Sequence, residues 1–177
     1  MDTSMSRINS TKGSVAQQVR DQYERIKHGM AKHAIADVCP SWLEDVAVGA
    51  IYPQECYYRA HRYATHPARM EEGVFLVHGE TGLLFGGHAW VELPDGLVFD
   101  GVFQQFYPLD VWDREAIPNR WYKFTPMAAG IITARLRKTH PGLYRWDAVL
   151  KLPWGDPAKP LVIDGDMANQ LLLAQGR

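Results

Sequence analysis

Residues 87–100 read GHAWVELPDGLVFD, and this stretch predicts a β-hairpin. Polar and apolar residues alternate over 88–93 and again over 97–100, as they do in strands that bury one face. Between the two runs lies Pro94-Asp95-Gly96, which is typical of a tight turn. The chain therefore contains at least one pair of antiparallel strands.

The length of this turn decides which side chains share a face of the sheet. With a two-residue loop, His88 and Asp100 would point to opposite sides. With a three-residue loop and Gly96 left-handed, Val91 pairs with Phe99 and the apolar residues of both strands form one face. His88 and Asp100 then become diagonal neighbours on the other face. The hydrophobic pattern alone favours the second register, so we expect the imidazole and the carboxylate to meet.

A helix that carries a thiol is predicted upstream of the hairpin. It opens around 53–55 and is stopped by Pro67, which places Cys56 in its first turn. Unpaired backbone N–H groups and the positive helix end favour a thiolate there. A thiol, an imidazole and a carboxylate together can build an activated nucleophile. We therefore predict Cys56 as nucleophile, His88 as general base and Asp100 as the acid that orients the imidazole.

Other polar and aromatic residues near these three are weaker candidates. Gln54 is a candidate side chain for binding an oxyanion beside the nucleophile's backbone amide, but its position favours helix capping or plain solvent exposure. Trp90 shares a strand face with His88 and is predicted to line a substrate cleft. His78 with Glu80 is a rival base and acid.

The rest of the chain predicts helices followed by strands. Residues 1–13 are rich in Ser, Thr and Asn and predict a disordered leader, while 14–177 form one domain. Helices are expected over 14–34, 41–49, 127–137 and 167–174, further strands over 72–78, 121–124 and 148–152, and a loop over 157–160. N-terminal helices packed on an antiparallel sheet make the fold class α+β.

The composition limits the partners that can be expected. The chain has 177 residues, 46% apolar and 22% charged, with a net charge of −1, which is typical of a globular protein that binds neither nucleic acid nor a membrane. No apolar run approaches the roughly 20 residues of a membrane span, and the leader lacks a signal core. We expect a cytoplasmic protein, although delivery by a dedicated machine would leave no mark. Neither a disulfide between Cys39 and Cys56 nor a metal or other cofactor is expected.

These motifs resemble a known family. Cys56 at a helix start, Gly-His-Ala-Trp at 87–90 and Asp100 after the next strand are similar to the transglutaminase-like branch of the papain-like cysteine peptidase superfamily. Glu72-Gly73-Val74 adds a likeness to small bacterial and phage members. The resemblance covers about residues 54–100 and implies a papain-like core with a Cys-His-Asp triad. The chain departs from the family after Asp100, where Gly101-Val102 replaces the frequent Pro-Thr.

The resemblance implies a thiol hydrolase, a peptidase or amidase, whose substrate is a peptide or protein amide and which needs no cofactor. Three alternatives stay open: acyl transfer to an amine, as in a transglutaminase; hydrolysis of murein peptides; and a binding or inhibitory protein on an inactivated triad. The sequence leaves the oligomeric state and the role of 101–177 undecided.

Overall fold

The hairpin at residues 87–100 forms strands β2 (Gly87–Glu92) and β3 (Leu97–Asp100) in the computed structural model of the protein. Val91 lies opposite Phe99, and Gly96 occupies the turn at φ +76°. The three-residue loop predicted from the hydrophobic pattern is therefore confirmed, and with it the face that each side chain occupies.

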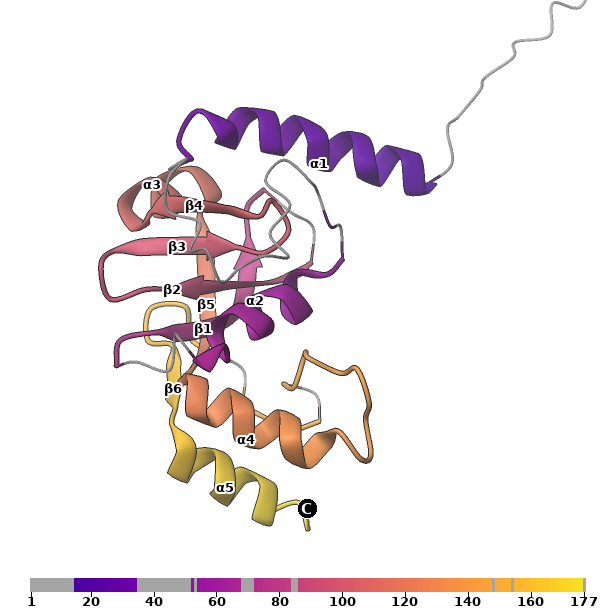
Figure 1. Cartoon of the computed structure of the whole chain (residues 1–177), viewed down its shortest axis with the longest axis vertical. Coiled ribbons are helices and arrows are strands. Elements are labelled where there is room, and N and C mark those ends of the chain that lie inside the picture. The colour runs from indigo at the N-terminus through magenta and orange to yellow at the C-terminus, as the bar shows by residue number, and fades with distance from the viewer. Residues whose placement is uncertain are drawn as a thin grey trace, which may run out of the picture.

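The structure describes residues 15–34, 52, 54–67, 72–83, 86–147, 149–153 and 155–176. The predicted leader, the predicted helix at 41–49 and Cys39 lie outside these ranges. Within them the chain forms five helices and six strands (Figure 1). The helices are α1 (Val15–Ala31), α2 (Cys56–Ala64), α3 (Leu109–Ala116), α4 (Pro126–Leu136) and α5 (Gly165–Leu173). The remaining strands are β1 (Phe75–Thr81), β4 (Gln105–Pro108), β5 (Pro118–Phe124) and β6 (Leu161–Ile163). The predicted α+β class is confirmed.

The strands form one sheet in the order β4-β3-β2-β1-β5-β6. All neighbouring pairs are antiparallel except β5 and β6, which run parallel. The prediction of a purely antiparallel sheet is therefore wrong at this edge. The chain between β5 and β6 contains α4 and a long loop, and a crossover of that length is what a parallel pair requires.

Helices cover both faces of the sheet. Helices α2, α4 and α5 pack on one face, against side chains that include Ala89, Val91 and Phe99. Helices α1 and α3 pack on the other, against side chains that include Trp90 and Val98. In Figure 1, α1 lies at one end of the molecule and α4 and α5 at the opposite end. Because the faces alternate along each strand, consecutive residues of β2 enter different cores.

Three regions of the chain differ from the prediction. Residues 149–152 form turns instead of a strand, because their N–H groups bond locally, as in Leu150 N–H to the Trp146 carbonyl at 2.8 Å. Strand β4, helix α3 and strand β6 were not predicted. All three are short, so they show little periodicity. Strand β6 also depends on a parallel partner, β5, from which α4 and a long loop separate it in the sequence. No helix among the described residues is long and apolar enough to cross a bilayer.

Candidate active site

Helix α2 begins at Cys56, as the sequence predicts. Gln54 turns the chain with a left-handed φ of +69°, and the Glu55 carbonyl accepts the first helical hydrogen bond, from Arg59 N–H at 2.9 Å. The Glu55 side chain does not cap the helix, because its carboxylate accepts from Arg59 Nε at 2.8 Å. The first-turn N–H groups therefore lack a side-chain cap from Glu55, and their positive potential acts on the Cys56 sulfur.

His88 and Asp100 are in direct contact. His88 Nε2–H donates to Asp100 Oδ2 at 2.8 Å, and both side chains are almost completely buried. The diagonal relation follows from the register of β2 and β3: the pairing of Val91 with Phe99, extended by one residue, sets Asp100 opposite Trp90, two residues beyond His88. The predicted meeting of imidazole and carboxylate is confirmed.

Asp100 is held on its other oxygen as well. Oδ1 accepts backbone N–H groups from Val102 at 2.7 Å and Phe103 at 3.2 Å. Gly101, between Asp100 and Val102, passes so close to α2 that a Cβ on it would lie 2.6 Å from the Cβ of Arg59. Gly101-Val102, the departure from the family pattern, thus fixes the carboxylate and lets β3 end against the cysteine helix.

The imidazole also reaches the thiol. Hydrogen bonding and charge from Cys56 raise the pKa of His88, and since Nε2 bonds Asp100, Nδ1 is the ring nitrogen left for the thiol. Burial alone would lower the pKa of His88, but the Asp100 carboxylate and the Cys56 sulfur raise it to about 10. The ring is therefore an imidazolium at neutral pH, and it links the thiol to the carboxylate.

Trp90 does not line a substrate cleft as predicted. Its side chain is completely buried, and its ring stacks near that of His88 with centroids 6.0 Å apart. Trp112 lies at a similar distance from His88, 6.3 Å. The Trp90 indole N–H donates to Glu92 Oε1 at 3.2 Å. The correction has a simple cause: α1 and α3 cover this face of the sheet, so Trp90 supports the imidazole from inside the core.

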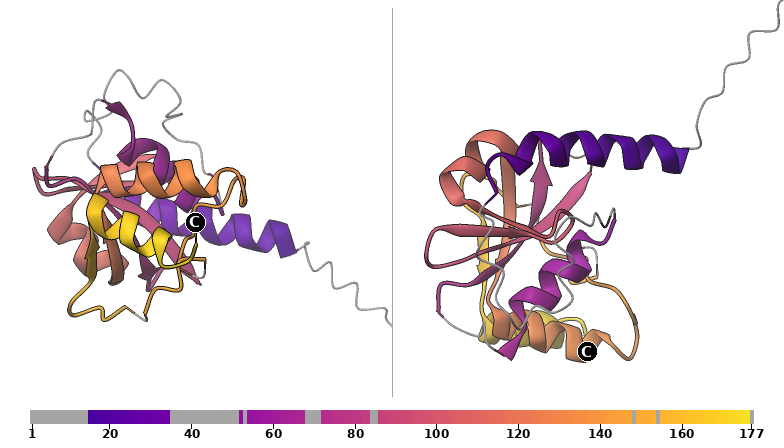
Figure 2. Two further views of the ribbon diagram at one scale, coloured as in Figure 1. Left: turned by 90° about the horizontal axis from the view of Figure 1, so that it is seen from below. Right: turned by 45° about the horizontal axis from the view of Figure 1, so that its top comes forward.

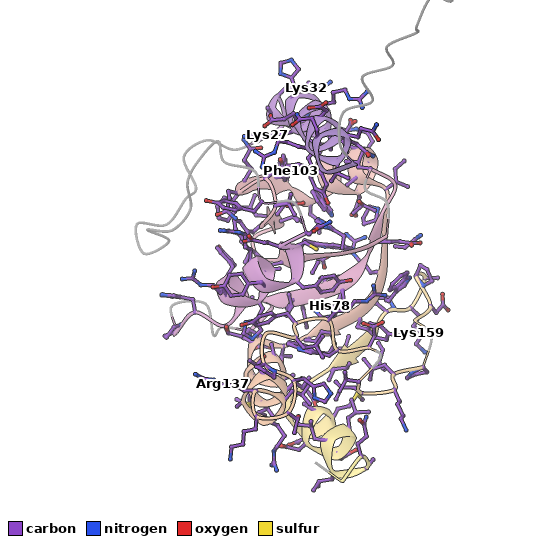
Figure 3. All side chains as sticks on the ribbon, turned by 90° about the vertical axis from the view of Figure 1, so that its right-hand side faces the viewer. Lys27, Lys32, His78, Phe103, Arg137 and Lys159 are labelled. Atoms are coloured by element: carbon purple, nitrogen blue, oxygen red, sulfur yellow. The ribbon has the colours of Figure 1, made fainter. Side chains whose placement is uncertain are left out.

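Helix α1 covers the thiol. Cys56 is 6% exposed and forms a buried cluster with Val102 and Phe103, against which Tyr23 and Ile26 of α1 pack. Figure 2 shows α1 crossing one end of the molecule, and Figure 3 places Phe103 directly beneath it. Burial raises the pKa of Tyr23, the charges of Cys56 and Asp100 raise it further, and a hydrogen bond from the Gln54 backbone opposes them. Sequence reasoning missed Tyr23, since it is one ordinary member of an amphipathic stripe.

The other predicted polar groups are placed less centrally. The Gln54 side chain is exposed, and its role with an oxyanion stays a prediction. His78 and Glu80 do not form a pair, because Glu80 accepts from Asn119 Nδ2 at 2.9 Å while both His78 nitrogens are buried without a hydrogen-bond partner in the described structure.

Among the described residues, no three His, Cys, Asp or Glu side chains gather as metal ligands would. Cys56 is a free thiol. Comparison of the chain with models of known protein families, with curated proteins and with solved structures finds no match.

Proposed function

We propose that this protein is a cysteine-dependent acyl hydrolase, a peptidase or amidase with a papain-like, transglutaminase-like core. One observation carries the proposal: Asp100 holds His88 in a buried hydrogen bond, and Cys56, at a helix start, lies close enough to the same imidazole to raise its pKa. Each group has the environment that its role requires, because the imidazole is protonated beside the sulfur and the carboxylate is fixed by two backbone N–H groups.

In the first half of the reaction, the Cys56 thiolate attacks the carbonyl carbon of an amide and forms a C–S bond. The oxyanion accepts a hydrogen bond from the Cys56 backbone N–H at the helix start. His88 Nδ1 then gives its proton to the departing amine as the C–N bond breaks. Asp100 keeps the ring oriented throughout, since its Oδ2 holds Nε2–H.

In the second half, water attacks the thioester carbonyl and His88 takes the proton of that water. The C–S bond breaks, the acid leaves, and the thiolate–imidazolium pair is restored. An amine in place of water would make the protein a transglutaminase, and a murein peptide as amide substrate would use the same steps. The chemistry of Cys56, His88 and Asp100 is common to all three.

One observation favours the alternative of a binding protein on an inactive triad. Cys56 and His88 are 6% and 1% exposed, so a substrate reaches them only if α1 or a neighbouring segment moves. Reactivity of the thiol toward acyl donors separates the two functions.

The experiment uses p-nitrophenyl acetate, a small activated acyl donor. We expect one acetyl group per molecule on Cys56, detected by mass spectrometry, and repeated release of p-nitrophenolate as the thioester hydrolyses. His88→Ala should slow acetylation by about a hundredfold, because general acid–base catalysis contributes on that scale. Cys39→Ser is the matched control and should keep the wild-type rate.

Equal acetylation of the Cys39→Ser protein with and without His88 would overturn the proposal, and so would its complete absence. Dansylcadaverine added with casein distinguishes the second nucleophile. Its incorporation into casein would assign the protein to acyl transfer, whereas release of peptides would support hydrolysis.

A further inference from the structure

Two side chains from different parts of the chain converge on Gly87, the residue before His88. A Cβ on Gly87 would collide with Tyr57 Oη and would lie 3.2 Å from Arg145 Nη1. Tyr57 follows Cys56 in α2, and Arg145 comes from the loop after α4. Glycine leaves the space that both side chains occupy, so the guanidinium lies beside the start of the histidine strand.

Asp147 orients the Arg145 guanidinium through two of its nitrogens, Nε and Nη2. Asp147 Oδ1 accepts from Arg145 Nε at 3.1 Å, and Oδ2 accepts from Nη2 at 3.4 Å. Arginine has five N–H donors in a planar group, and two of its edges can each donate two hydrogen bonds to a carboxylate. Asp147 takes the pair formed by Nε and Nη2. Among the described residues no carboxylate takes the pair formed by Nη1 and Nη2, on the edge that includes the atom next to Gly87.

Arg145 is also accessible and electrostatically linked to the nucleophile. Its side chain is 49% exposed, whereas Cys56 is 6% exposed, so solvent reaches the guanidinium far more freely than the thiol. Its pKa is raised mainly by the hydrogen bond to Asp147, and the charge of Cys56 contributes. Burial raises the pKa of Tyr57; the charge of Arg145 lowers this pKa, and the charge of Cys56 raises it further. Tyr57 therefore lies within the fields of both groups.

The acidic groups around this edge already have partners. Glu55 binds Arg59, Asp100 binds His88, and Glu80, opposite Gly87 in β1, accepts from the Asn119 amide. An incoming anion thus meets a donor edge whose neighbouring carboxylates are engaged.

We propose that Arg145 binds a carboxylate of the substrate and so selects acyl donors that carry a negative charge close to the scissile bond, such as acidic peptides. The inference rests on Cys56 being the nucleophile. No binding role was predicted for Arg145 from the sequence, because the loop that carries it has no periodic pattern and meets Gly87 only in the folded chain.

Two alkylating probes of nearly equal size test the charge preference. Iodoacetate and iodoacetamide both form an S–C bond with the thiolate and release iodide, but only iodoacetate carries a carboxylate. All variants carry Cys39→Ser, so that Cys56 is the one thiol that reacts. We expect Arg145→Gln to lower the ratio of the iodoacetate rate to the iodoacetamide rate by about fivefold, the scale of a partly exposed ion pair. The iodoacetamide rate itself should stay within twofold of the unsubstituted rate, on the order of normal variation for a surface change.

Arg137→Gln is the matched control, since Arg137 is an exposed residue at the end of α4, well separated from Phe103 in Figure 3. It should leave the ratio unchanged, and Arg145→Lys should retain part of the preference. An unchanged ratio in Arg145→Gln would overturn the inference, as would an equal loss of both rates, which would mean that Arg145 only supports the fold. If His88→Ala, made with Arg145 intact, left both alkylation rates unaltered, the proposed function would fail, whatever the ratio of the two rates.

Discussion

Two histidines, His88 in β2 and His78 in β1, are both 1% exposed yet differ completely in charge. His88 meets Asp100 and Cys56, and its pKa rises to about 10. His78 is surrounded by the rings of Tyr57, Phe124 and Trp146. Its pKa falls to about 3, mainly through burial, with further lowering by the charges of His61 and Arg145. Burial alone keeps an imidazole neutral, and a buried carboxylate reverses that effect.

The two rings are neighbours in the sheet but belong to different cores. His78 is paired with Ala89, and Gly79 with His88, so the two side chains project from opposite faces. A shift of one residue in the β1 register would move His78 onto the face that carries His88. The comparison shows that strand register, as well as residue type, decides which histidine meets a carboxylate.

The largest expected effect concerns the carboxylate. Asp100→Asn leaves a buried imidazole without its anionic partner and should lower the free energy of unfolding by about 4 kcal/mol. Asp147→Asn removes a carboxylate from the more exposed pair with Arg145 and should lower it by less than about 1 kcal/mol. Urea unfolding at pH 7 measures both. Similar losses in the two variants would contradict the contrast between buried and exposed pairs.

The next effect distinguishes the two histidines by thiol reactivity. In the Cys39→Ser background at pH 6, His88→Ala should slow alkylation of Cys56 by iodoacetamide about a hundredfold, because the thiolate loses its imidazolium partner. His78→Phe should keep the rate within about twofold, since His78 projects from the face opposite His88 and a phenyl ring keeps the packing against Tyr57. A comparable loss in both variants would mean that reactivity follows general stability and that His88 has no specific role.

The pH dependence of stability has opposite signs for the two rings. The pKa of His78 is depressed on folding, so its contribution is complete above about pH 6.5 and is lost as the pH falls toward 3. The pKa of His88 is raised, so its contribution is complete below about pH 6.5 and is lost as the pH rises through about 10.

His78→Phe isolates the acid limb of this dependence. Between pH 7 and pH 5 the wild type should lose about 2 kcal/mol more stability than the Phe variant, because only the unfolded wild type gains a proton at His78. Thermal or urea unfolding across this range gives the difference. Parallel curves for the two proteins would show that His78 is protonated, or free to leave the core, near neutral pH.

The smallest effect concerns access to the thiol. Tyr23→Ala removes the α1 ring that covers Cys56 and should speed its reaction with the bulky reagent 5,5′-dithiobis(2-nitrobenzoate) about tenfold, a change of roughly 1.4 kcal/mol. Glu24→Ala, at an exposed neighbouring position of α1, is the control and should have no effect. A rate unchanged in Tyr23→Ala would show that other segments close the site.

Much of the candidate site could be predicted because its geometry is set locally. Alternation along 87–100 fixes the hairpin register, and that register alone brings His88 to Asp100. The residues at 53–55 indicate a helix start, and the helix begins at Cys56. The strand predicted at 148–152 was wrong because a short apolar run has no period of its own, and its N–H groups bond to nearby carbonyls instead.

The sequence by itself determined the hairpin, its faces and the helix that begins at Cys56, because each depends on hydrogen bonds and side-chain patterns within a few residues. Only the tertiary structure decided that Trp90 lies inside the core, that Tyr23 covers the thiol and that Arg145 reaches Gly87. These contacts join segments far apart in the chain, and they depend on how helices and loops pack across the sheet. Long-range packing leaves no periodic mark on the residues that it brings together.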